Sequence, residues 1–136
     1  MATAYAPLID TDVLIDYLRG HPRAVAFISA LPDTVYISSI AVAELHVGVR
    51  EGRERVALAD LLSTLSCLDV SAEIAQQAGL LRRDFGRSHG VGLNDAIIAA
   101  TALAHGLQLC TLNVKHFPSL KKSQLKQAYD KSKLSN

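Results

Sequence analysis

The chain has 136 residues, of which 49% are apolar and 20% charged, so it suits one globular domain and is not an intrinsically disordered chain. The net charge of +1 is unevenly distributed along the chain. Residues 1–120 are acidic, with 9 Lys or Arg against 12 Asp or Glu, and residues 121–136 are basic, with 5 Lys against 1 Asp. Overall charge therefore does not indicate a nucleic-acid-binding protein, and any such function must come from a local site.

The cysteines and the apolar runs indicate the compartment. Cys67 and Cys110 both lie in apolar stretches, and two cysteines form neither a disulfide framework nor a zinc signature. We expect two buried free thiols and a cytoplasmic location. The first ten residues lack the pattern of a secretion signal, and the longest apolar run, AIIAATALA, is too short to span a membrane.

The first half of the chain alternates short apolar runs with helical periods. The runs YAPLI and TVYISS, at residues 5–9 and 34–39, are typical of strands. Ser39 is placed to cap a helix that follows the second strand. The stretches with helical spacing cover residues 10–20, 22–31 and 39–52.

The second half continues the alternation. Apolar residues at Val56, Ala59, Leu62 and Leu65 predict a helix over residues 53–65. Further strands are expected at residues 67–70 and 107–112, and further helices over residues 71–90 and 94–106. Strands that alternate with helices imply an α/β fold with a mainly parallel sheet and helices on both faces.

Residues 121–136, KKSQLKQAYDKSKLSN, are polar and Lys-rich, with weak apolar spacing. This pattern leaves open a short helix, a frayed end or a segment added for expression. We therefore divide the chain into a domain of residues 1–120 and a basic C-terminal tail of residues 121–136.

Three aspartates lie close together in PLIDTDVLIDYL. Asp10 directly follows the first predicted strand, at the edge where parallel α/β sheets bind ligands. Asp10 or Asp12 can instead simply cap the following helix. Asp16 lies one turn further and can pair with Arg19, so we interpret it as mainly structural.

Glu44 and Asp95 are acidic residues with apolar helical neighbours. Glu44 can reach water at the edge of its helix, or it can bind a cation or a buried partner. Asp95 can favour its helix dipole in the first turn, or it can hold a cation at the helix entrance. With Asp10, these residues form three oxygen donors that suit Mg²⁺ or Mn²⁺ and phosphodiester chemistry.

Arg82, Arg83 and Arg87 cluster near the end of the helix predicted over residues 71–90. They form either an ordinary solvated face or a surface that contacts RNA phosphates. The sequence leaves both possibilities open.

Three blocks, LIDTDVLIDYL, SSIAVAELHVGV and GLNDAIIAATALAHGLQLCTLNVKHF, resemble in this order the signature blocks of PIN-domain ribonucleases. Within that family the sequence is most similar to VapC toxins of bacterial toxin–antitoxin pairs. The resemblance covers roughly residues 5–120. It implies a three-layer α/β/α sandwich around a mainly parallel sheet and an endoribonuclease that depends on Mg²⁺ or Mn²⁺.

By position, the resemblance assigns metal binding to Asp10, Glu44 and Asp95, with Asn113 added to the catalytic set. Asp12 and Thr111 become supporting residues. Asn113 and His116 stand where many relatives carry an acid, so the resemblance implies three acidic ligands instead of four. The matching positions are Asp10, Asp12, Glu44, Asp95, Thr111, Asn113 and His116.

The same resemblance implies partners. Family members cleave RNA, form homodimers and are silenced by a small VapB-like antitoxin whose C-terminal segment lies across the active-site groove. DNA is expected to be contacted only through the antitoxin, and no contact with a membrane is expected.

Two other functions fit parts of the sequence. A haloacid-dehalogenase-type phosphatase also begins with a strand that ends in Asp-x-Asp, but it needs a catalytic Lys, and the first Lys here is Lys115. A non-catalytic module with the same fold would use the groove only to bind a partner. The missing fourth acid is the reason to consider this second alternative.

Overall fold

The computed structural model describes residues 5–131, and within them five strands and six α-helices form one α/β domain. The strands are β1 Pro7–Ile9, β2 Tyr36–Ser38, β3 Ser66–Leu68, β4 Gln108–Thr111 and β5 Leu125–Gln127. The α-helices are α1 Thr11–Leu18, α2 Pro22–Ser29, α3 Ser39–Val47, α4 Arg53–Ser63, α5 Ala72–His89 and α6 Leu93–His105. None of the helices in this part of the chain is long and apolar enough to cross a bilayer.

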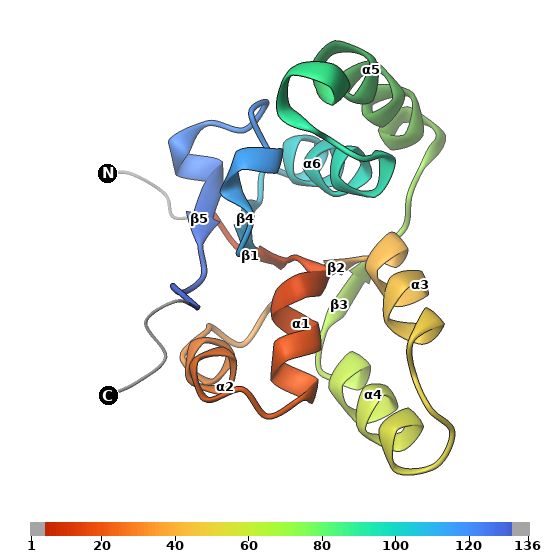
Figure 1. The fold of residues 1–136 in the computed structure, drawn as a ribbon, viewed down its shortest axis with the longest axis vertical. Helices are drawn as coiled ribbons and strands as arrows, with labels where there is room; N and C mark the ends of the chain where they lie inside the picture. The colour runs from red at the N-terminus through yellow and green to blue at the C-terminus, as the bar shows by residue number, and fades with distance from the viewer. Residues whose placement is uncertain (1–4, 132–136) are drawn as a thin grey trace.

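All five strands are parallel and lie in the order β3-β2-β1-β4-β5. Helices α5 and α6 cover one face of the sheet, and α1, α2 and α4 cover the other (Figure 1). The parallel α/β sandwich expected from the sequence is therefore confirmed. Because parallel strands end at the same edge, the residues that follow β1, β2 and β4 meet there.

The two faces of the sheet divide the aliphatic core. Leu8 and Leu109 pack with the buried residues of α5 and α6, whereas Ile9 and Cys110 pack with those of α1, α3 and α4. Neighbouring residues of one strand point to opposite faces, so a three-residue strand can contribute to both clusters. This double burial holds β1, and hence Asp10 directly after it, firmly in place.

Helix α3 begins and ends differently from the sequence expectation. The side chain of Ser38, not Ser39, accepts a hydrogen bond from the Ile40 backbone N–H, 3.2 Å away, and caps the helix. The helix ends at Val47, and Gly52, with φ +98°, instead precedes α4. The predicted helix over residues 39–52 was therefore too long at its C-terminus.

Helix α4 lies where it was expected, and its buried face is narrow. Leu58 and Leu61 are buried, whereas Val56 is 60% exposed. A strict three-residue spacing drifts around a helix of 3.6 residues per turn, so Val56 falls opposite the stripe that contains Leu58 and Leu61. Val56 and Ala59, which marked the helical period in the sequence, therefore lie on the exposed face of α4.

The two thiols also differ from each other. Both cysteines are free, and Cys110 is buried in β4, as expected. Cys67 is exposed, because β3 is the outermost strand at its edge of the sheet. The expectation that both thiols are buried was wrong for Cys67.

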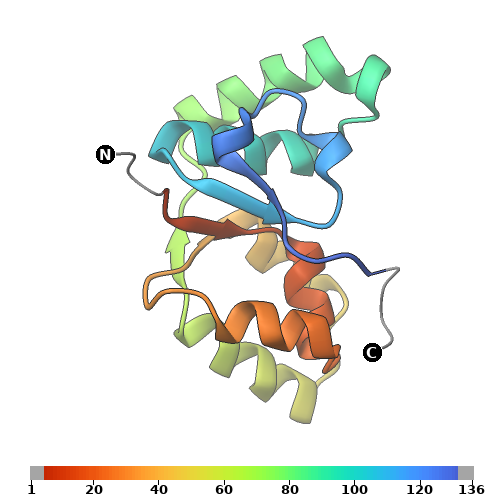
Figure 2. The ribbon, with the colours of Figure 1, turned by 90° about the vertical axis from the view of Figure 1, so that its left-hand side faces the viewer.

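Residues 125–131, within the basic C-terminal tail, pack on the domain. Residues 125–127 form β5, which pairs with β4. The chain then crosses toward α1 and α2 (Figure 2), where the ring of Tyr129 stacks on His21 at 5.7 Å. Residues 132–136 lie outside the described part of the chain.

This C-terminal segment supplies the partners of Asp16. The buried carboxylate of Asp16 accepts hydrogen bonds from the Tyr129 hydroxyl at 2.8 Å and from Nζ of Lys131 at 3.0 Å. No pair between Asp16 and Arg19 is present among residues 5–131, so the partner expected for Asp16 was wrong. Burial alone would raise the pKa of Asp16, but the bonds from Tyr129 and Lys131 outweigh it and lower the pKa.

Removing the Tyr129 hydroxyl is expected to destabilise the protein. Tyr129→Phe leaves a buried carboxylate oxygen without its donor and should lower the free energy of unfolding by about 1–3 kcal/mol at pH 7. Because the pKa of Asp16 is lowered in the folded protein, this loss should shrink as the pH falls from the ordinary value of 3.8 through the lower folded pKa. Urea unfolding at several pH values measures both effects.

Tyr17→Phe is the control, because the hydroxyl of Tyr17 donates no hydrogen bond to residues 5–131 and the residue adjoins Asp16. Equal effects of the two substitutions would show that the bond to Asp16 does not stabilise the fold.

Candidate active site

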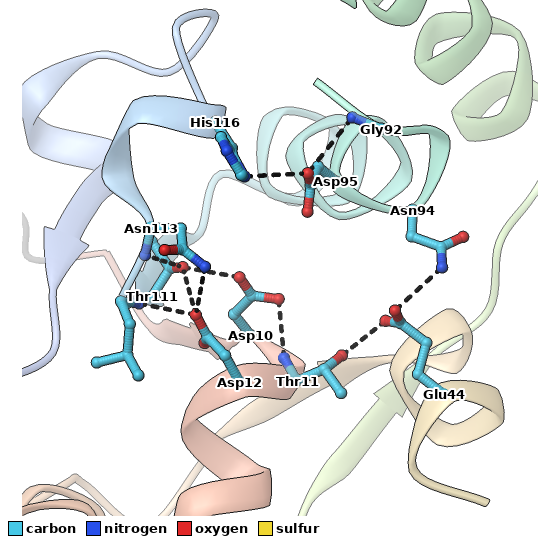
Figure 3. Close-up of polar contacts among 11 residues, drawn as sticks. Asp10, Thr11, Asp12, Glu44, Gly92, Asn94, Asp95, Thr111, Asn113 and His116 are labelled. Atoms are coloured by element: carbon cyan, nitrogen blue, oxygen red, sulfur yellow. Dashed lines mark hydrogen bonds and ion pairs between the residues drawn. The ribbon is translucent and has the colours of Figure 1, made fainter. Parts of the chain in front are cut away.

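Four acidic side chains gather at the carboxyl edge of the sheet (Figure 3). Asp10 directly follows β1, Asp12 lies in the first turn of α1, Glu44 lies on α3, and Asp95 lies in the first turn of α6. The charges of Asp12 and Asp95 act on Asp10, and the charge of Glu44 acts on Asp95. The topology thus brings together acids that are 85 residues apart between Asp10 and Asp95.

Asp10 is 7% exposed and has two structural contacts. Its Oδ1 accepts a hydrogen bond from the Thr11 backbone N–H at 2.8 Å, so the residue does cap α1. Its Oδ2 accepts a hydrogen bond from the buried Thr111 hydroxyl at 2.7 Å. Capping therefore occupies only one oxygen of Asp10, and the carboxylate still takes part in the acidic site.

Asp12 is tied to the loop after β4. Its Oδ2 accepts hydrogen bonds from the Leu112 backbone N–H at 3.1 Å and from the Asn113 side-chain amide at 3.4 Å. The Thr111 hydroxyl lies 3.3 Å from the same oxygen. The other oxygen, Oδ1, is buried and has no hydrogen-bond partner within residues 5–131. Asp12 therefore keeps one carboxylate oxygen that the described chain does not satisfy.

Glu44 joins the site through two neutral donors. The Thr11 hydroxyl donates to Oε1 at 2.7 Å, and the Asn94 amide donates to Oε2 at 3.0 Å. Each of these donors adjoins another acid in the chain, Asp10 or Asp95. Figure 3 shows both donors reaching Glu44 from opposite sides.

Asp95 is the fourth acid of the site. Its Oδ2 lies 3.4 Å from the Gly92 backbone N–H and 3.5 Å from Nδ1 of His116. The Gly92 contact explains the start of α6 at Leu93, one residue before the predicted start at Asn94. His116 comes from the 3₁₀ helix Val114–His116 and is the basic side chain drawn beside the acids in Figure 3.

Asp10, Asp12 and Asp95 have raised pKa values. Burial, followed by the charge of Asp12, raises the pKa of Asp10 to about 7, against hydrogen bonds from Thr111 and Thr11. Burial also raises the pKa values of Asp12 and Asp95, in the second case assisted by the charge of Glu44. The site therefore holds more negative charge than the surrounding protein compensates.

This arrangement fits a hard divalent cation. The donors are carboxylate oxygens, and the unpartnered buried Oδ1 of Asp12 shows that the local hydrogen bonds are incomplete. Within residues 5–131, no group of three or more Asp, Glu, His or Cys side chains already lies close enough together to hold a metal ion. An open site of this kind suits Mg²⁺, which keeps several waters and takes few protein ligands.

Without a divalent cation, Asp10→Asn is expected to stabilise the protein at pH 8 but not at pH 4. The folded pKa of about 7 lies above the ordinary value of 3.8, so ionised Asp10 opposes folding increasingly as the pH rises between them. The uncharged amide should add on the order of a few kcal/mol at pH 8. Urea unfolding in EDTA at both pH values tests this.

Asp60→Asn, on the exposed surface of α4, is the matched control for this comparison. A gain that is the same at pH 4 and pH 8 would contradict a charge effect at Asp10.

The three arginines singled out in the sequence lie apart from these contacts. Arg82, Arg83 and Arg87 are exposed on α5, and Arg83 pairs with Asp84 at 2.9 Å. None of them makes a hydrogen bond or ion pair with the acids within residues 5–131.

A groove extends from Glu44 between α1, α3 and α4. Apolar and half-buried side chains share its lining with basic ones at Arg19, Arg50 and Arg53. The apolar lining residues are Ile15, Leu18, Leu45, Val49, Ala57 and Leu58. An amphipathic segment could therefore bind beside the acids.

Sequence reasoning found the acids but missed two of the residues that hold them. Thr11 and Asn94 were not among the candidate site residues predicted from the sequence. Their side chains donate hydrogen bonds to Glu44, which lies 33 residues from Thr11 and 50 residues from Asn94 in the sequence. The available signal was that each is a short polar residue next to a candidate metal ligand.

The chain is similar to a known protein family over most of its length. The family model described as PIN domain matches residues 8–122. Ribonuclease VapC10 of Mycobacterium tuberculosis is 44% identical over 114 residues, which cover 82% of this chain and 85% of that protein.

Two solved structures extend the similarity to three dimensions. A toxin–antitoxin complex from Klebsiella pneumoniae aligns with a TM-score of 0.79 and 32% identity, covering 92% of this chain and 99% of that chain. VapBC2 from Rickettsia felis, bound to a DNA fragment from its promoter, aligns with a TM-score of 0.70 and 29% identity, covering 89% and 97%.

Proposed function

Because this chain belongs to the PIN-domain family, we propose that it is a divalent-metal-dependent endoribonuclease and the toxin of a toxin–antitoxin pair. The observation that carries this proposal is the group of Asp10, Glu44 and Asp95 at the carboxyl edge of the sheet. Membership of the PIN family also removes the reason to consider the phosphatase.

Asp10, Glu44 and Asp95 would hold Mg²⁺ or Mn²⁺. The bound ion would orient a water for attack and neutralise charge that develops on the phosphodiester. Asp10 is fixed by its cap bond and by Thr111, which leaves the chain little freedom to move this ligand. Hydrolysis would break one P–O bond in RNA and leave a 5′-phosphate on one product.

Thr111 and Asn113 would keep the loop after β4 against the acids. The Asn113 backbone N–H donates to the Thr111 hydroxyl oxygen at 3.1 Å, and its amide donates to Asp12. Asn113 thus serves better as a donor that orients Asp12 than as a replacement for a fourth acidic ligand. This favours one tightly held cation over two.

Arg82, Arg83 and Arg87 would contact RNA phosphates outside the acidic site. Their guanidinium groups are exposed, and Arg forms strong hydrogen bonds to phosphate. Phosphate contacts of this kind position RNA without reading its sequence.

The partner that fits best is a small VapB-like antitoxin. The similar chain from Klebsiella pneumoniae belongs to a toxin–antitoxin complex, and that from Rickettsia felis was solved with promoter DNA. We place the antitoxin segment in the groove beside Glu44 and assign DNA contact to the antitoxin alone. A homodimer in the cytoplasm remains our expectation for the toxin itself.

Blocking the groove is expected to separate antitoxin binding from RNA cleavage. Ala57 lines the groove and is exposed, so Ala57→Arg should fill space there without disturbing the core. We expect at least a tenfold weaker affinity for the antitoxin and unchanged cleavage by the free toxin. Titration calorimetry and an RNA cleavage assay measure the two effects.

Ala59→Arg, also exposed on α4 but outside the groove lining, is the matched control. If both variants bind antitoxin as tightly as wild type, the segment does not bind in this groove.

Cleavage of RNA by the antitoxin-free protein tests the function itself. With Mg²⁺ or Mn²⁺, wild type should cut single-stranded RNA internally and leave 5′-phosphate ends. A folded wild-type protein that cuts no cellular RNA would instead support the non-catalytic binding module.

A further inference from the structure

Glu44 differs from the other acids of the site because, within residues 5–131, it accepts hydrogen bonds from side chains alone. The other three acids each also accept a hydrogen bond from a backbone N–H. Glu44 lies on α3, and its long side chain can adopt several rotamers. Ordering a long, flexible Glu side chain costs conformational entropy. Two hydrogen bonds, from Thr11 at 2.7 Å and from Asn94 at 3.0 Å, already restrict it.

The chemistry of these two donors matters as much as their distances. A hydroxyl and an amide are neutral, so they orient the carboxylate without neutralising its charge, as a Lys or Arg would. Each carboxylate oxygen has two lone pairs, so one bond to each oxygen of Glu44 leaves lone pairs for a cation.

The positions of the donors connect the three acidic segments. Thr11 follows Asp10 in the chain. Its backbone N–H donates a hydrogen bond to Asp10, and its hydroxyl donates one to Glu44. Asn94 precedes Asp95 at the start of α6. Glu44 is therefore held from both sides by the chain neighbours of the other two acids (Figure 3).

We propose that Thr11 and Asn94 are positioning residues that preorganise Glu44 and so set the affinity of the site for its divalent cation. This inference rests on the proposed function, because it assigns a cation to the same acids. Outer-shell partners of metal ligands typically contribute 10–100-fold to metal affinity. Thr11 and Asn94 act on cation binding, and the chemical step at saturating cation does not depend on them.

Mn²⁺ titration of the metal-free full-length protein tests this proposal by calorimetry. Thr11→Val keeps the shape of the side chain and removes the hydroxyl, whereas Thr11→Ser keeps the hydroxyl. Thr11→Val should weaken Mn²⁺ binding several-fold, and Thr11→Ser should bind within about twofold of wild type. Adding Asn94→Ala to Thr11→Val should bring the total loss to about 10–100-fold.

Asn94→Ala alone provides a second variant, because Asn94 is exposed and its loss does not threaten the core. Leu93→Ala, at the adjacent exposed position, controls for any change at the start of α6. RNA cleavage by the Thr11→Val variant should approach the wild-type rate as Mn²⁺ reaches saturation.

Wild-type Mn²⁺ affinity in both Thr11→Val and Asn94→Ala would overturn the positioning role while leaving the proposed function intact. A cleavage rate that stays low at saturating Mn²⁺ would also overturn it, because these residues would then affect the chemical step or the fold. Absence of Mn²⁺ binding and RNA cleavage in wild type would overturn the proposed function together with this inference.

Discussion

Asp95→Asn is expected to reduce the rate of RNA cleavage by about 10³-fold or more, and Asp10→Asn should do the same. Either change keeps the shape of the side chain but removes one negative charge and one strong oxygen ligand from the site. Metal stabilisation of transition-state charge contributes several kcal/mol, and each 1.36 kcal/mol corresponds to a tenfold change in rate. Initial rates on a single-stranded RNA at fixed Mg²⁺ measure the loss.

The pH dependence of stability distinguishes a catalytic loss at Asp10 from unfolding. The metal-free Asp10→Asn protein should be more stable than wild type at pH 8, so its inactivity cannot be attributed to a damaged fold. Asp60→Asn, a matched substitution on the surface of α4, should cleave at the wild-type rate. Wild-type rates in the Asp10 and Asp95 variants would show that these acids do not take part in cleavage.

Removal of divalent cations is expected to stop cleavage altogether. Three acids with raised pKa values and an unpartnered oxygen on Asp12 form a site whose negative charge the protein does not balance. Incubation with EDTA should therefore abolish activity, and added Mg²⁺ or Mn²⁺ should restore it. Product formation on a denaturing gel provides the measurement.

A sample with EDTA and excess Mg²⁺ controls for effects of the chelator itself. Undiminished cleavage in EDTA alone would contradict a metal-dependent mechanism and would direct attention to His116 and Asn113 as metal-independent groups.

The candidate acids were accessible from the sequence because local patterns mark their positions. Asp10 stands where a strand pattern changes to a helical one, and Asp95 stands at the start of an apolar helix. These transitions occur at the carboxyl edge of a parallel sheet, so the topology alone brings such residues together. Glu44 was marked by its apolar neighbours on one helix.

The contacts that hold the acids were not accessible in the same way. Thr11 and Asn94 have local roles that explain them fully at the level of sequence, yet their hydrogen bonds join segments 33 and 50 residues apart. Such bonds depend on how α1, α3 and α6 pack together. No periodicity within one helix contains that information.

The C-terminal segment shows the same limit for the fold. Residues 125–127 have little strand character of their own, and β5 exists because β4 offers an edge with which it can pair. Asp16 likewise had a plausible local partner in Arg19, but it bonds Tyr129 and Lys131 instead. Tertiary packing thus replaced the local expectation in both places.

That Asp10, Glu44 and Asp95 together bind one divalent cation is tested most directly by anomalous diffraction from crystals grown with Mn²⁺. We expect one Mn²⁺ peak at the carboxyl edge of the sheet, within about 2.5 Å of a carboxylate oxygen of each residue. The same crystals of Asp95→Asn should show a weakened peak or none. A Mn²⁺ peak bound elsewhere, with none among these three carboxylates in an active wild-type protein, would contradict the assignment.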